Sequence, residues 1–289
     1  MAPSFIVRNL LGALGALLVA AAVHATPTCP DRSTVEQARA ADQREALLPA
    51  LVQCLGSTDP TQRDALGFET LSLWLRGKQL GPNAHLRLLA ELEGQWLLDD
   101  NGVRRSFVLL SLAEVARSDR IQPWLSTEGR RALLDSALQR VQAWSDYRDF
   151  DDTVGWRHGI AHGADLLLQL ALHPAHGPAE QAQILTALGS QVLAQGQHAY
   201  QAGEGARLAR ATIWALIKSD WNDARWRAHL QRLAGGLGPD TNWSRARLIR
   251  LHNWREFLWP LYVALQEQPD AALKARYLPA LQEQLRRLP

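Results

Sequence analysis

This sequence contains few cysteines and methionines, and its positive and negative charges are nearly balanced. Its 289 residues contain two cysteines and one methionine, and 31 Lys and Arg residues stand against 29 Asp and Glu, a formal net charge of +2. So balanced a surface gives no electrostatic reason to expect nucleic acid or an anionic membrane as a partner. Alternating apolar and polar runs typical of strands are also lacking, whereas Leu, Ala, Arg and Gln favour helices. These features predict an all-α protein.

Long apolar runs are absent after the first 25 residues. The run from Leu10 to Val23 follows Arg8 and ends in Val23-His24-Ala25, the layout of a secretory signal peptide. At 14 residues the run is shorter than the roughly 20 that a transmembrane helix needs. We therefore expect a signal peptide over residues 1–25, export to the periplasm, and a single all-helical domain over 26–289 that makes no contact with the membrane after cleavage.

The two cysteines, Cys29 and Cys54, lie close to the start of the mature chain. An oxidising compartment favours a disulfide between them, which would tie the new N-terminus to the first helix. The alternative is a pair of free thiols, and the sequence leaves both open.

A weak internal repeat pairs amphipathic helices across short Pro- and Gly-containing turns. Leucines at similar positions of the repeat are separated by 39, 58, 46 and 49 residues, close to the roughly 40–47 of HEAT and armadillo arrays; they are Leu73, Leu112, Leu170, Leu216 and Leu265. The pattern predicts an α-α superhelix, or degenerate HEAT-like array, of about five helical hairpins. The longest interval contains the acidic segment 145–152, which we expect to form a loop on the binding face.

His158, His162 and Asp165 follow directly after that acidic segment. In a helix predicted over 153–172, their spacing places all three side chains on one face, and the surrounding apolar residues predict a buried helix. Three explanations are open: ligands for a divalent metal, a proton-transfer site in which Asp165 orients a histidine, or a structural hydrogen-bond network. The motif lacks the glutamate of zinc proteases, so that class is excluded.

Three further residues complete the predicted ligand-binding set. Trp156 lies within one turn of His158, and Glu204 and Arg207 stand at a predicted helix start. Glu204 and Arg207 form either a local ion pair or, with Glu204 facing the histidines, part of the same groove. No catalytic residue is assigned.

Several segments together are similar to the bacterial domain-of-unknown-function family 2785. They are Asp59-Pro60-x-x-Arg63-Asp64, Arg105-Ser106-Phe107, Gly155-Trp156-x-His158-x-x-Ala161-His162-Gly163-Ala164-Asp165, Glu204-x-x-Arg207-Leu208-Ala209 and Asn253-x-x-x-Phe257-Leu258. The resemblance implies an all-helical protein and no established activity. Most family members are not exported, so the predicted signal peptide is a departure.

Two functional hypotheses follow. One is a metal- or ligand-binding protein, extending to a metal-dependent hydrolase, that acts on a small molecule or peptide. The other is a non-enzymatic scaffold for a protein or peptide, in which the His and Asp side chains only stabilise the fold. The sequence leaves open the metal, the reaction and the oligomeric state.

Overall fold

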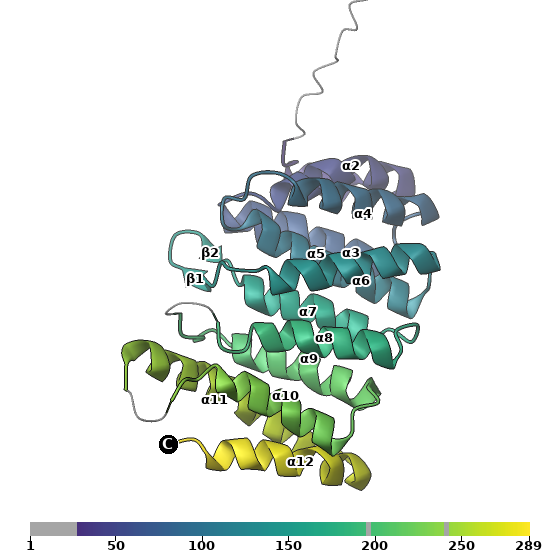
Figure 1. Cartoon of the computed structure of the whole chain (residues 1–289). Coiled ribbons are helices and arrows are strands. Elements are labelled where there is room, and N and C mark those ends of the chain that lie inside the picture. Colours follow the sequence, from purple (N-terminus) through teal and green to yellow (C-terminus); the bar gives the residue numbers. More distant parts are fainter. Residues whose placement is uncertain (1–27, 195–197, 240–242) are drawn as a thin grey trace, which may run out of the picture.

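A computed structural model describes residues 28–194, 198–239 and 243–289. The predicted all-α class is confirmed, because the helices of the described residues pack into one array (Figure 1). The predicted signal peptide lies outside the described residues. None of the helices in the described part of the chain is both long and apolar enough to cross a membrane.

The elements follow one another with short connections. The N-terminal part comprises α1 (Arg32–Gln37), α2 (Ala41–Cys54), the π-helix η1 (Thr61–Phe68), α3 (Glu69–Arg76) and α4 (Pro82–Trp96). The middle comprises α5 (Arg104–Ile121), α6 (Thr127–Gln142), the short strands β1 (Phe150–Asp151) and β2 (Gly155–Trp156), α7 (Gly159–Leu172) and α8 (Pro178–Ser190). The C-terminal part comprises α9 (Glu204–Lys218), α10 (Asp223–Gly235), α11 (Arg245–Gln266) and α12 (Ala271–Arg286).

The predicted helical hairpins form a two-layered array. They are α3–α4, α5–α6, α7–α8, α9–α10 and α11–α12, and each turns near the Pro, Gly or Ser residues that the sequence places there. One layer is continuous, since α5 packs on α7, α7 on α9, and α9 on α11. The N-terminal ends of these helices meet at one edge, from which the β1–β2 hairpin projects (left in Figure 1).

Helix α7 lies at the centre of that layer and is buried, as the sequence predicts. Eleven of its 14 residues are buried. It begins at Gly159, however, and the predicted start at residue 153 is wrong. The Asp151 side chain accepts hydrogen bonds from the backbone N–H groups of Thr153 (2.9 Å) and Val154 (2.8 Å), and Gly155 has a φ of +76°. This turn competes with the helix for the same backbone donors.

Helix α11 continues through Pro260. Proline cannot donate to the carbonyl four residues earlier, which here belongs to Glu256. That carbonyl lies against Gly205 of α9, where an added Cβ would come within 2.6 Å of its oxygen. The close approach of α9 and α11 therefore depends on a glycine at position 205.

Cys29 and Cys54 form a disulfide, so the first of the two alternatives is correct. It joins the start of the described chain to the end of α2. The hydrophobic core then runs without a break from Ala38 to Leu281.

Candidate functional site

The candidate site lies at the edge where the N-terminal ends of α5, α7 and α9 meet. Ser106 stands in the first turn of α5, His158 and His162 at the start of α7, and Glu204 at the start of α9. The loop between α6 and α7 and residues 198–203, which precede α9, lie at this edge. Helix N-termini present free N–H groups and favour negative charge, so a carboxylate is well placed there.

His162 is a buried, neutral imidazole. Its Nδ1 lies 3.1 Å from the backbone carbonyl of Ser106, which can only accept, so Nδ1 carries the proton and Nε2 the lone pair. Its ring packs edge-on against Phe107. Burial, reinforced by the neighbouring His158, lowers the pKa of His162 to about 3.

His158 directly precedes α7 and adopts a left-handed backbone conformation with φ of +52°. Its Nε2 donates to the carbonyl of Ala202 at 3.0 Å and lies 3.9 Å from Glu204 Oε1. The half-exposed ring of Trp156 stacks on the imidazole at 4.7 Å. Burial, with the charge of Arg207, lowers the pKa of His158, which keeps this ring neutral as well.

Asp165 and Arg207 form an ion pair between α7 and α9. The local Glu204–Arg207 pair is thus replaced by a longer-range one, and Glu204 faces His158 as the groove alternative predicts. Burial raises the pKa of Asp165 despite the adjacent guanidinium. His158, His162 and Asp165 therefore each contact a protein group, and their assignment as metal ligands stays a prediction.

A different group of metal-ligand types comes together beside His158. Asp149, His198 and Glu204 each offer one ligand atom, and these atoms lie within 4.8 Å of one another. Asp149 comes from the acidic segment after α6, His198 from the loop after α8, and Glu204 from α9. Asp149 and His198 are partly exposed, whereas Glu204 is buried. The group is thus open to solvent on one side.

Two atoms of this group lack a protein partner. Glu204 Oε2 accepts a hydrogen bond from the Ala202 N–H at 3.0 Å, but Glu204 Oε1 and His198 Nε2 are buried with no hydrogen-bond partner in the described residues. Burial, with the nearby Asp149 charge, raises the pKa of Glu204. A carboxylate in this position is therefore short of positive charge.

Asn253 of α11 holds the loop that carries His198. Its side-chain oxygen accepts from the Tyr200 N–H at 2.8 Å, and its amide donates to the carbonyls of His198 (2.9 Å) and Leu193 (3.3 Å). All of its hydrogen bonds are thus made to one loop backbone, which fixes the position of His198.

Arg63, Asp64 and Phe107 extend the same cluster. Arg63 is fully buried, pairs with Asp64 at 2.7 Å and lies over the Phe107 ring, 4.5 Å from its centroid. Since Phe107 packs on His162, the segments around residues 63, 106 and 162 form one contiguous unit. Arg63 and Asp64 are ion-pair partners.

The approach of Asp149 and His198 to Glu204 was missed from the sequence. Asp149 lies in the acidic segment that the longest repeat interval marks as a loop, so its region was signalled but not the residue. The approach of His198 to Asp149 depends on packing between two loops, which no local pattern encodes.

The fold and the site together define the class of protein: a layered helical array with imidazole and carboxylate groups at one edge. A family model described as "Protein of unknown function (DUF2785)" matches residues 97–263. This is more than half of the chain, which therefore belongs to that family, in agreement with the resemblance. The match includes Asp149, His158, His162, His198 and Glu204. No curated protein and no solved structure matches the chain.

Proposed function

We propose that this protein binds a divalent metal ion through Asp149, His198 and Glu204. The observation that supports this most strongly is the pair of buried ligand atoms without partners, Glu204 Oε1 and His198 Nε2. Leaving a buried polar atom unsatisfied costs about 1–3 kcal/mol. A bound cation offsets that cost for both atoms and supplies the positive charge that Glu204 lacks.

The donor set suits a first-row metal. One imidazole and two carboxylates bind zinc, manganese or nickel, whereas calcium prefers an all-oxygen set. In a tetrahedral site with bonds of about 2.1 Å, ligand atoms stand roughly 3.4 Å apart. Since the ligand atoms lie within 4.8 Å of one another, they need to approach by at most about 1.4 Å, within reach of two side chains on loops.

Three protein ligands leave a fourth position for water, as in catalytic zinc sites. The neutral His158 imidazole beside Glu204 keeps its Nε2 proton in the bond to Ala202, so Nδ1 would be the nitrogen able to accept a proton. Trp156 stacks on His158, contacts Phe150 and is 42% exposed, and its exposed part would contact a substrate. These features support metal-dependent hydrolysis of a small molecule or peptide.

Export to the periplasm is part of the proposal. The predicted signal peptide suggests it, and the Cys29–Cys54 disulfide supports it, because such bonds persist in oxidising compartments.

The alternative function is a non-enzymatic scaffold for a peptide or protein. It is favoured by the protein contacts of His158, His162 and Asp165, which match a structural network. If the protein is such a scaffold, this edge binds metal ions no more tightly than the surface carboxylates do.

Calorimetric titration of metal-free protein with zinc and with manganese distinguishes the two functions. We expect one ion per chain for wild type and at least a tenfold weaker association for Glu204→Gln, since the amide keeps the size but not the charge. Glu128→Gln, an exposed substitution in the first turn of α6, is the matched control and should bind as wild type does. Equal affinities for wild type and Glu204→Gln would rule out the proposed ligand set.

A further inference from the structure

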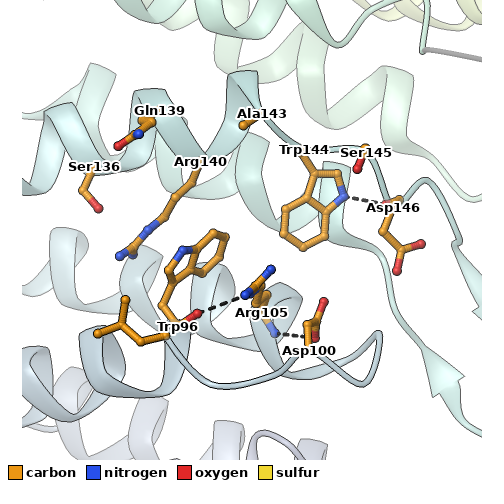
Figure 2. A pocket seen from close by; sticks show the side chains of 11 residues that line it. Trp96, Asp100, Arg105, Ser136, Gln139, Arg140, Ala143, Trp144, Ser145 and Asp146 are labelled. Carbon is orange, nitrogen blue, oxygen red and sulfur yellow. Dashed lines mark hydrogen bonds between the residues drawn. The ribbon is translucent and has the colours of Figure 1, made fainter.

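The cleft between α4 and α6 offers a ligand no free aromatic face. Figure 2 shows that Arg140 and Arg105 lie close to Trp96, and their guanidinium carbons are 4.3 and 5.5 Å from its ring centroid. Trp144 is buried in contact with Trp96, and their ring centroids are 6.2 Å apart. The tryptophans of this cleft are therefore already covered by protein groups.

A smaller pocket lies at the C-terminal end of the array, where the end of α12 packs against α10 and α11. Its volume is about 160 Å³, and an apolar cavity of roughly 150 Å³ is known to bind benzene. Most of its wall is apolar, and Leu251 and Trp254 of α11 belong to the buried part of it; the apolar lining residues are Ala234, Leu237, Leu251, Trp254 and Leu288. The pocket therefore has room for one six-membered ring.

The wall of this pocket contains a buried amide without a partner. Gln284 of α12 is 2% exposed, and its Nε2 is buried with no hydrogen-bond partner in the described residues. Its Oε1 accepts no hydrogen bond from the described residues either. A buried polar group without a partner is costly, so a ligand that supplies one gains affinity.

The indole of Trp254 is a second uncommitted group of the same wall. Its face stacks on Phe257, at 5.8 Å between ring centroids, so a ligand would not lie against that face. Its Nε1–H, however, forms no hydrogen bond with the described part of the chain. An indole nitrogen can only donate, so the pocket favours a ligand with an acceptor atom.

The charged group at this pocket is already paired. Arg287 donates to Glu283 at 2.6 Å, and Glu283 also pairs with Arg227. An anionic ligand would have to compete with Glu283, and no carboxylate of the described residues lines the pocket to receive a cation. The pocket therefore suits a neutral ligand.

We propose that this pocket binds a neutral one-ring carbonyl compound, such as an aryl ketone or an aryl amide. The ring would fill the apolar space beside Leu237, Leu251 and Leu288. A carbonyl oxygen has two lone pairs, so it can accept from both the Trp254 indole and the Gln284 amide. A hydrocarbon ring of the same size would leave both groups without a partner.

Ligand-observed NMR on the whole protein, in the presence of a metal chelator, tests this by comparing acetophenone with ethylbenzene. The two probes are similar in shape, but only acetophenone has a carbonyl. We expect the dissociation constant of acetophenone to be about tenfold lower, the effect of a buried hydrogen bond. Benzoate, the anionic analogue, should bind more weakly than acetophenone. These comparisons use wild type, so they do not depend on the folding of a variant.

Gln284→Leu replaces the amide by an apolar group of similar size. This variant should lose the preference for acetophenone and still bind ethylbenzene. Gln282→Leu, on the same helix but outside the pocket, is the matched control and should keep the preference.

Four results would overturn the proposal. They are no binding of either probe to wild type, ethylbenzene bound as tightly as acetophenone, benzoate bound more tightly than acetophenone, and a preference for acetophenone that survives in Gln284→Leu. None of them depends on metal binding, because the pocket contains none of the three proposed ligands.

Discussion

His162 is the residue whose environment is most completely defined. Its pKa of about 3 follows from burial, and its Nδ1 proton is held by the Ser106 carbonyl. Protonation would place a charge beside His158 and near Arg63 and Arg207, all of which oppose it. His162 therefore acts as a neutral link between α5 and α7, whether or not an ion binds nearby.

Stability should fall on acidification because of this histidine. Its pKa is about 3 when folded and about 6.5 when unfolded, so between these values the unfolded chain binds a proton that the folded chain does not. The stabilising contribution is present above pH 6.5 and is lost as pH falls toward 3. Between pH 6.5 and pH 5 the loss should be about 2 kcal/mol.

The measurement is urea unfolding of wild type and His162→Gln at both pH values. Glutamine does not titrate, so wild type should lose about 2 kcal/mol more than the variant on acidification. Buried carboxyls with a raised pKa, such as Asp165, change stability in the opposite direction but are present in both proteins. If the difference in unfolding free energy between wild type and variant were the same at both pH values, His162 could not be a buried neutral imidazole.

At the scale of elements, the site depends on how α9 and α11 pack. Gly205 of α9 follows Glu204 directly and lies against the Glu256 backbone of α11. Asn253, one turn earlier on α11, holds the loop of His198. One helix pair thus positions two of the three proposed ligands.

Gly205→Ala should destabilise the protein by several kcal/mol, because the new Cβ meets backbone atoms that cannot rotate away. Gly94→Ala is the control: this glycine lies inside α4 and a Cβ there meets nothing within 4 Å, so alanine should stabilise by about 0.5–1 kcal/mol. Thermal unfolding of both variants measures the effect. Similar shifts in melting temperature for Gly205→Ala and Gly94→Ala would mean that α9 and α11 are not in close contact at Gly205.

Asn253→Ala should weaken zinc binding about 10- to 100-fold, although Asn253 touches no ion. The reason is that residues holding a ligand in place affect affinity on this scale. Calorimetric titration measures the affinity, and circular dichroism of the same sample establishes that the helices are retained. Unchanged affinity in a folded variant would show that the loop positions His198 without this clamp.

At the scale of the whole molecule, local patterns predicted the array well and the site only in part. The hairpins were predictable because turns and apolar helix faces are encoded within each segment. The burial of α7 followed from its composition for the same reason. His158 was misplaced on a helix face, because the turn made by Asp151 ends the helix earlier than periodicity implies. Asp149, His198 and Glu204 meet only through tertiary packing of two loops, which one sequence does not reveal.

The disulfide should contribute to the stability of the whole array. It closes a loop of 25 residues, for which the chain-entropy description gives about 3–4 kcal/mol. Calorimetry should therefore show a melting temperature several degrees lower for Cys29→Ser, Cys54→Ser than for the oxidised wild type. A reducing agent should lower the wild type to the same value and leave the variant unchanged. If reduction has no effect on wild type, the bond does not support the fold.

Anomalous diffraction at the zinc edge, from crystals of the zinc-loaded protein, tests the metal proposal most directly. The account predicts a peak about 2.0–2.2 Å from donor atoms of Asp149, His198 and Glu204. A peak held instead by His158, His162 and Asp165, or no peak at this edge of the array, would contradict it.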